Sequence, residues 1–237
     1  MTNLISKFIV VVPAAGAGKR MLSNSPKQYL KIGSKSVIEH TLSNLLAHPL
    51  IKKIIVSLSP SDEYFNGLNV SKDPRVLQVI GGKERVDSVL NGLLCLDQKA
   101  NPWVLVHDAA RPCVTHEEIT RLIEQCVNND IGGLLAVPVV DTLKKNVPMT
   151  TNTNAKVEKT VDRKDIWQAL TPQMYKTNEL ISAIENALDK SLDITDESSA
   201  IESIGLASML VLGNRQNIKI TRPEDLALAA FYLNKST

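Results

Sequence analysis

The sequence predicts a single-domain α/β fold over residues 1–237, with a Rossmann-like, mostly parallel sheet flanked by helices. Short apolar, β-branched runs recur along the chain, and helical patterns lie between most of them, an alternation typical of parallel sheets. The apolar content of 43% is enough to bury one sizeable core. The predicted strands are Phe8 to Val12, Ile54 to Leu58, Val76 to Ile80, Val104 to Val106, and Leu134 to Val139.

Four helices have clear sequence signals. Three begin at a capping box, in which a hydroxyl residue is followed three residues later by a carboxylate. In the fourth, between Glu84 and Leu96, apolar residues recur at helical spacing, so this helix should follow the loop at Gly81 and Gly82. The capping boxes are Ser36 with Glu39, Thr115 with Glu118, and Thr221 with Glu224.

A polar segment at 141–161, rich in threonine and lysine, has no apolar face wide enough to be buried in a domain core. Two alternating stretches, Thr142 to Val147 and Lys156 to Val161, flank a turn rich in Asn and Thr, which predicts a protruding β-hairpin arm. A disordered loop is the alternative from composition alone. We expect such an arm to hold a second subunit, and therefore a homodimer.

Composition narrows the class of protein. The formal charge is only +2, from 27 basic and 25 acidic residues without a long basic run, so we expect small anionic ligands and no nucleic acid. No segment has the length of a membrane span. Three cysteines without paired metal spacing argue against a disulfide framework or structural zinc, and they suit a reducing, cytoplasmic compartment. Lys7 and the run after it are too short and too weakly basic for a signal peptide.

A glycine loop, PAAGAGKRM-x5-PKQY from Pro13 to Tyr29, follows the first predicted strand. Gly16 and Gly18 lack a Cβ, so the backbone can turn tightly and bring N–H groups close to phosphate oxygens. Arg20 can bind two oxygens in a fork, and Lys27 adds a mobile point charge. The loop therefore predicts a phosphate site, with an ordinary tight turn as the alternative.

Two common phosphate motifs do not fit this loop. A P-loop needs Ser or Thr after its Gly-Lys pair, but here Gly18 and Lys19 are followed by Arg20. A dinucleotide-binding motif needs a third glycine or alanine where this chain has Met21, which argues against a nicotinamide-dependent reductase.

Other informative residues also follow predicted strands, where ligands collect in open parallel sheets. Gly81 and Gly82 would let the main chain approach a base edge, and Asp108 in VHDAARP is suited to magnesium or, alternatively, to capping a loop. Arg111 is close enough in sequence to join the same anionic site. Lys219, between Ile218 and Ile220, fits an exposed β-position, although most such lysines are only solvated.

Several segments together carry a resemblance. They are the glycine loop, GG-x2-R-x2-SV from Gly81, VHDAARP, TVDR, TPQ, TDE-x-SA and NIKIT-RPEDL. In this order they resemble the 2-C-methyl-D-erythritol 4-phosphate cytidylyltransferase family almost from end to end. The first motif alone, which many sugar-nucleotide pyrophosphorylases share, would indicate only nucleotidyl transfer.

The resemblance implies a reaction in isoprenoid-precursor synthesis. The phosphate of methylerythritol phosphate would attack the α-phosphorus of CTP in line and release pyrophosphate, with Mg²⁺ or another divalent cation present. Such transfers depend on positioning and electrostatic stabilisation, so no enzyme nucleophile is needed. A ribitol- or other polyol-phosphate cytidylyltransferase, and a nucleotide-binding protein without turnover, are the alternatives.

The resemblance also implies roles for single residues. Arg20 and Lys27 would stabilise the developing phosphate charge, while Arg163 and Lys219 would position the attacking phosphate. Asp108 would lie near the metal and the ribose. The positions expected around the cytidine are Ala14, Ala15, Gly16, Gly82 and Ser88. Those expected around the second substrate are Ala109, Arg111, Thr142 and Thr195, and the partner chain would complete that site.

Overall fold

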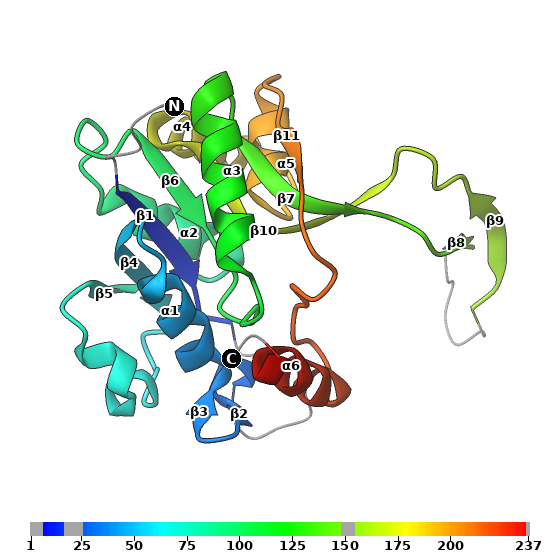
Figure 1. Cartoon of the computed structure of the whole chain (residues 1–237). Helices are drawn as coiled ribbons and strands as arrows, with labels where there is room; N and C mark the ends of the chain where they lie inside the picture. Colours follow the sequence, from blue (N-terminus) through cyan, green and yellow to red (C-terminus); the bar gives the residue numbers. More distant parts are fainter. Residues whose placement is uncertain (1–6, 17–25, 148–154, 236–237) are drawn as a thin grey trace.

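The computed structural model describes residues 7–16, 26–147 and 155–235, and a seven-stranded sheet forms its centre (Figure 1). The strand order is β11-β7-β10-β6-β1-β4-β5. Only β10 runs antiparallel to its neighbours in this sheet, so the predicted mostly parallel α/β fold is confirmed. The strands are β1 (Phe8–Pro13), β4 (Ile51–Leu58), β5 (Val76–Ile80), β6 (Trp103–Val106), β7 (Gly133–Pro138), β10 (Trp167–Lys176) and β11 (Met209–Leu212).

All five predicted strands are present, and two further strands of this sheet, β10 and β11, were not predicted. Strand β10, WQALTPQMYK, contains Pro172 and has no continuous β-branched run, so it lacks the usual sequence signal. Its pairing with β7 shifts register between Ala169 and Gln173, around the TPQ triplet. Strand β11, MLVL, is four residues long and has a single β-branched residue, so it too lacks the usual signal.

Helices cover both faces of the sheet and build two separate cores. Helices α1 (Val37–Ala47) and α3 (His116–Asn129) pack on one face around residues such as Val10 and Leu105. Helices α2 (Arg85–Leu94), α4 (Thr177–Asp189) and α5 (Glu197–Ser203) pack on the other face around Val11 and Val104. Successive β1 residues thus supply opposite faces, as strand geometry requires.

A third, smaller core lies beside the sheet. Helix α6 (Pro223–Lys235) packs near the short hairpin β2 (Lys31–Ile32) and β3 (Lys35–Ser36), in a cluster that includes Ile220 and Ala110. This packing holds the segment before α6 against the loop that follows β6. Short 3-10 turns complete the described elements: η2 (Lys27–Tyr29), η3 (Phe65–Gly67) and η4 (Asn69–Lys72).

The capping predictions are confirmed for α1 and α3, where both reciprocal bonds are present. The prediction for α6 is wrong in its carboxylate. Helix α6 begins at Pro223, which places Asp225 at the third helical position, and its Oδ2 accepts from the backbone N of Thr221 and of Arg222, both at 2.8 Å. Glu224 points instead toward Arg222, 3.9 Å away.

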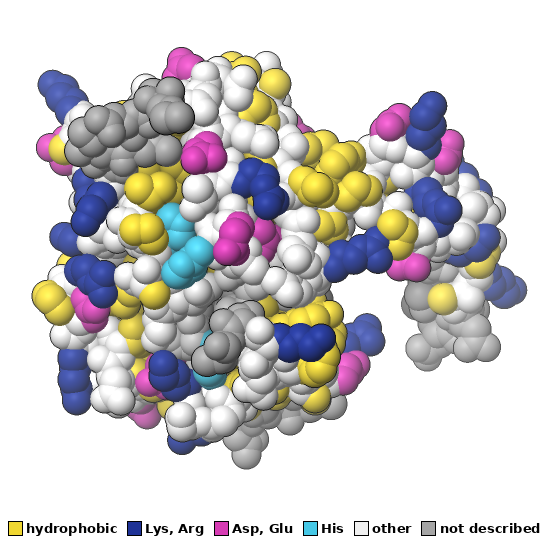
Figure 2. Space-filling view, in the orientation of Figure 1, with side chains coloured by type: hydrophobic (Ala, Val, Ile, Leu, Met, Phe, Trp, Pro, Cys, Tyr) yellow, Lys and Arg dark blue, Asp and Glu magenta, His cyan; other side chains and the backbone are white. Residues whose placement is uncertain are grey.

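The predicted arm is a β-hairpin of β8 (Leu143–Asn146) and β9 (Val157–Val161), paired antiparallel. It projects from the globule, and its surface carries many lysine and arginine side chains (Figures 1 and 2). The turn at 148–154 lies outside the described residues. Among the residues that the structure describes, no helix is long and apolar enough to cross a membrane.

Candidate active site

A cavity of about 590 Å³ opens at the carboxyl ends of β1, β5 and β6. Strand order reverses between β1 and β6, because the chain passes from β1 to β4 on one side and reaches β6 on the other, and ligands of open α/β sheets bind at such a point. The charged lining residues among those described are four cations and two carboxylates, a net charge of +2 that favours an anion. They are Lys27, Lys83, Arg85, Lys219, Glu84 and Asp108.

The described part of the glycine loop is held in place by Gln28, which is 4% exposed. Its Nε2 donates to the carbonyl oxygen of Ala14 at 2.8 Å and to that of Gly16 at 3.4 Å. The glutamine of PKQ therefore ties the two ends of the loop together, and Lys27, beside it in η2, lines the cavity. A Cβ on Gly16 would meet no atom of the described residues within 4 Å, and Gly16 lines the cavity.

The second glycine loop packs tightly on its own helix. A Cβ on Gly82 would lie 2.1 Å from the Cβ of Asp87, and one on Gly81 would lie 2.6 Å from that of Ala15. The hydroxyl of Ser88 accepts from Gly82 N at 3.0 Å and donates to Glu84 O at 3.1 Å. These contacts fix the main chain of Gly82 at the cavity wall.

Asp108 lies at the centre of a cluster of cations and is 7% exposed. Its Oδ2 is 2.8 Å from Lys219 Nζ and 3.4 Å from Arg111 Nε, while its Oδ1 is 3.2 Å from Arg85 Nε. Burial alone would raise the pKa of Asp108, but Arg85, Lys219 and Arg111 lower it far below its usual range. Asp108 therefore stays ionised and holds three cations together.

This environment does not suit Asp108 as a direct ligand of Mg²⁺, because both of its oxygens already face cations. No group of three or more His, Cys, Asp or Glu side chains that could hold a metal occurs in the described part of the chain. Magnesium ligation by Asp108 stays a prediction that this arrangement does not favour.

His107, next to Asp108, is fully buried and holds the same loop in place. Its Nε2 lies 3.0 Å from Arg111 O, and its Nδ1 lies 2.9 Å from Thr171 Oγ1, which also accepts from Asp108 N at 3.1 Å. These partners fit one arrangement, in which neutral His107 donates from Nε2 and Thr171 donates to Nδ1. Burial lowers the pKa of His107 to about 4.

This lowered pKa predicts an acid-sensitive fold. Unfolded His107 titrates near its ordinary pKa of 6.5 and folded His107 near 4, so the unfolded chain binds more protons between these values and stability falls as pH drops. We expect His107 to account for a loss of about 3 kcal/mol in unfolding free energy over this window. Urea unfolding from pH 7 to pH 4 should show a shallower pH dependence for His107→Gln; an identical slope would contradict the assignment.

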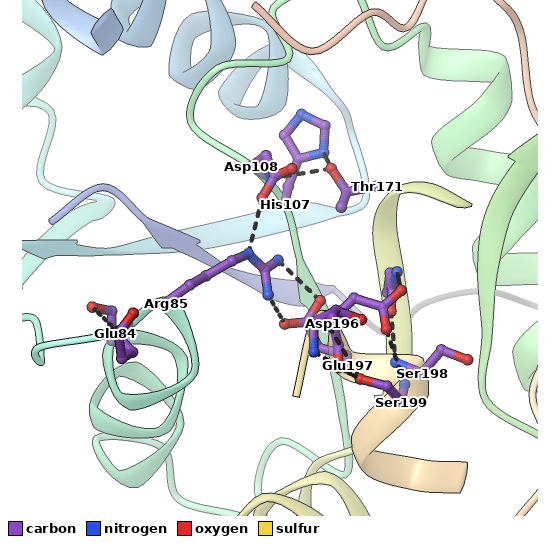
Figure 3. A network of polar contacts seen from close by, with 12 residues as sticks. Glu84, Arg85, His107, Asp108, Thr171, Asp196, Glu197, Ser198 and Ser199 are labelled. Atoms are coloured by element: carbon purple, nitrogen blue, oxygen red, sulfur yellow. Dashed lines mark hydrogen bonds and ion pairs between the residues drawn. The ribbon is translucent and has the colours of Figure 1, made fainter. Parts of the chain in front are cut away.

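The TPQ triplet joins the remaining motifs to this loop. Gln173 accepts from Ser198 N at 2.8 Å and donates to Asp196 Oδ2 at 2.9 Å, which fixes the start of α5. Asn217 donates to Thr171 O at 2.8 Å, and its own carbonyl accepts from Arg111 at 2.7 Å. TPQ, TDE, VHDAARP and NIKIT thus form one hydrogen-bonded unit. Figure 3 shows the part of it around His107, Asp108, Thr171 and the start of α5.

The cavity brings together many of the residues predicted from sequence. Lys219 lies in an irregular segment rather than the predicted β-position, and it reaches the cavity through its contact with Asp108. Gly18 and Arg20 lie outside the described residues. Predicted residues that line the cavity are Ala14, Ala15, Gly16, Lys27, Gly82, Ser88, Asp108, Ala109 and Lys219.

Four predicted residues do not line this cavity. Arg111 is buried behind Asp108 and supports it. Thr142 and Arg163 are exposed at the base of the arm, where Arg163 donates to Val140 O, and Thr195 is exposed before α5.

Arg85 was missed as a site residue, although it is the arginine of the quoted GG-x2-R segment. It lines the cavity and contacts both Asp108 and Glu197. Gln28, the glutamine of PKQ, was likewise quoted without a role. The partners of Arg85 and of Gln28 lie far from them in the sequence, so motif spacing alone could not reveal these contacts.

Comparison with known proteins identifies the family. The model of the 2-C-methyl-D-erythritol 4-phosphate cytidylyltransferase family matches residues 8–235. The chain belongs to this family. It is 55% identical over 232 residues to the enzyme of that name from Colwellia psychrerythraea, covering 97% of this chain and 96% of that protein. The enzyme of the same name from Vibrio parahaemolyticus is 50% identical over 236 residues, covering 99% of both chains.

Solved structures agree with this assignment. The crystal structure of the Francisella tularensis 2-C-methyl-D-erythritol 4-phosphate cytidylyltransferase has a TM-score of 0.80 and 35% identity, covering 96% of this chain and 100% of that chain. The family model thus covers the glycine loop, the Gly81–Gly82 loop, VHDAARP and NIKIT, which meet around the cavity, and also TVDR and TDE, which do not line it.

Proposed function

We propose that this protein transfers CMP from CTP to 2-C-methyl-D-erythritol 4-phosphate, giving 4-diphosphocytidyl-2-C-methyl-D-erythritol and pyrophosphate in the non-mevalonate isoprenoid pathway. The observation that carries the proposal is the cationic cavity at the strand-order reversal, in a chain of the cytidylyltransferase family. Its volume is within the range of about 300–1,000 Å³ that is typical of small-molecule sites.

Lys27 and Arg20 would supply the electrostatic part of catalysis. Lys27 lines the cavity beside the described end of the glycine loop, where a triphosphate would meet main-chain N–H groups. The negative charge that develops on the α-phosphate and on the leaving pyrophosphate would be stabilised by both cations. The buried thiols Cys113 and Cys126 have pKa values raised to about 12 by burial, which suits residues without a nucleophilic role.

The cytosine would be read by main-chain groups of the two glycine loops. Ala14, Ala15, Gly16 and Gly82 all line the cavity. Gln28 donates to the carbonyl oxygens of Ala14 and Gly16, and Gly82 N donates to Ser88 Oγ, so both loops are held in place. Because these contacts precede ligand binding, the site is pre-organised for the base.

Gly82→Ala tests this pre-organisation. The new Cβ would lie 2.1 Å from Asp87 Cβ, so the loop must move away from the cavity wall, and we expect the Kd for CTP to rise about tenfold, as overpacking of roughly 1–3 kcal/mol implies. Gly67→Ala is the matched control, since its Cβ would meet nothing within 4 Å. Calorimetric titration with CTP measures both; equal affinities would count against the proposed base site.

A divalent cation would bind through the phosphate oxygens of CTP. Magnesium commonly binds waters and substrate phosphates and few protein groups. Such a site would not need Asp108 as a ligand, and the oxygens of Asp108 already face cations. Lys219 pairs with Asp108 and lines the same cavity, where it would bind the phosphate of the acceptor.

The acceptor site would be completed in a homodimer. Arg163 and Thr142 lie at the base of the projecting arm and do not line this chain's own cavity, so a partner's arm would bring them to it. We expect replacement of 142–161 by a short Gly-Ser linker to give a monomer that binds CTP but has little turnover. Sedimentation velocity with an activity assay measures this; a dimeric, fully active variant would refute the role of the arm.

Pyrophosphate release tests the reaction itself. We expect CTP consumption only when methylerythritol phosphate and a divalent cation are both present, in a cytoplasmic enzyme whose three cysteines remain thiols. Ribitol 5-phosphate, assayed beside it, tests the acceptor: exclusive use of ribitol phosphate would replace the first proposal with the polyol alternative. Tight CTP binding without turnover on any acceptor would favour a non-catalytic nucleotide-binding protein.

A further inference from the structure

Arg85 joins two motifs that lie far apart in the sequence. It is the first residue of α2, and its side chain extends between Asp108 after β6 and Glu197 at the start of α5 (Figure 3). Its Nη1 and Nη2 lie 2.6 and 3.1 Å from the two carboxylate oxygens of Glu197, while its Nε lies 3.2 Å from Asp108 Oδ1. The planar guanidinium suits this forked contact, and a lysine could not reproduce it.

Glu197 depends on this contact. It is 2% exposed, and in the described part of the chain Arg85 is the cation that the structure pairs with it. Burial works against the charge of Arg85, but Glu197 and Asp108 outweigh it and raise the pKa of the guanidinium above its usual range. A buried ion pair of this kind stabilises little by itself, yet it fixes the relative positions of the elements that carry it.

Both ends of the bridge lead to residues predicted to bind the acceptor. Asp108 uses Oδ1 for Arg85 and so presents Oδ2 to Lys219 Nζ at 2.8 Å. Glu197 is the first residue of α5, so its ion pair ties the start of that helix to Arg85, and Thr195 lies two residues before it with its backbone N 3.1 Å from Ser199 Oγ. Arg85 therefore sets the geometry of Lys219 and of Thr195 together.

We propose that Arg85 and Glu197 are positioning residues for the acceptor phosphate. Their ion pair holds Lys219, through Asp108, and the segment of Thr195 at a fixed separation. The inference rests on the proposed function, because it concerns the acceptor side of that same site. Glu197 itself does not line the cavity, so its effect must pass through Arg85.

The test compares KM values in Glu197→Gln, Arg85→Lys and the double variant. Glu197→Gln keeps the size of the side chain and removes its charge; we expect the KM for methylerythritol phosphate to rise about tenfold or more, as loss of precise placement does. The KM for CTP should stay within about twofold in this variant. The double variant should be no worse than Arg85→Lys alone, because the two residues act through one contact.

Ile123→Val, in the opposite core, is the control for lost stability alone, since Ile123 is buried and remote from the bridge. It should leave both KM values unchanged. If the wild type is active and Glu197→Gln has a normal KM for the acceptor, the inference is overturned. Additive effects of the two substitutions in the double variant would overturn it as well. A wild type without turnover on any polyol phosphate would overturn the proposed function and this inference with it. If Arg85→Lys does not fold, the KM split in Glu197→Gln decides alone.

Discussion

Lys27→Ala should lower kcat by about a hundredfold or more, because removing one pre-organised donor to a transition-state charge costs roughly 3 kcal/mol. Lys27 lines the cavity from η2 and is part-exposed, so its side chain contributes little to core packing. The free energy of unfolding should therefore change by less than about 0.5 kcal/mol. Steady-state turnover and urea unfolding on the same preparation separate the two effects.

Lys31→Ala is the matched control for Lys27→Ala. Lys31 is an exposed lysine of β2, four positions along, and does not line the cavity. Its replacement should leave both kcat and stability at wild-type values. An unfolded Lys27→Ala variant, or one with normal turnover, would count against the catalytic role.

Asp108→Asn should show the opposite balance, with a large loss of stability. The neutral amide leaves Lys219 and the buried Arg111 without their carboxylate partner, and breaking a buried ion pair costs on the order of 3 kcal/mol. We therefore expect the free energy of unfolding to fall by about 3 kcal/mol, with acceptor binding weakened because Lys219 is no longer held.

Urea unfolding at pH 7 measures this loss, with Asp189→Asn as its control. Asp189 is exposed at the end of α4, and its replacement should change stability by no more than about 0.5 kcal/mol. If Asp108→Asn were as stable as the control, the carboxylate would not be what holds the three cations together.

The parallel part of the fold was predictable because each strand carries its own signal. β1, β4, β6 and β7 are largely buried apolar runs, and β5 at the sheet edge is a short apolar run as well, so local sequence indicates all five strands. Strand β10 is recognisable only from its neighbours: β7 pairs with it before and after a proline-containing register shift, and β6 pairs with it after the shift. The start of α6 was also not predictable from local sequence. Glu224 and Asp225 are adjacent, and which of them caps the helix depends on the residue at which the helix begins.

The nucleotide side of the site was more predictable than the acceptor side. Ala14 to Gly16 and Gly82, for which we propose backbone contacts to the base, line the cavity directly after predicted strands, so a strand end and a glycine indicate them. Arg85 acts across more than a hundred positions on Glu197, and no periodicity reports such a contact. Arg163 and Thr142 depend on the arm, whose proposed partner lies beyond a single chain.

A crystal structure of the protein with CTP and a divalent cation tests the central claim most directly. We predict that the cytosine lies against the main chain of Ala14 to Gly16 and Gly82 and that the triphosphate lies beside Lys27. Lys219 should lie on the side of the α-phosphate from which the acceptor attacks. The Arg85 bridge from Asp108 to Glu197 should be intact. CTP bound elsewhere, or bound here with Lys27 directed away from the phosphates, would contradict the account.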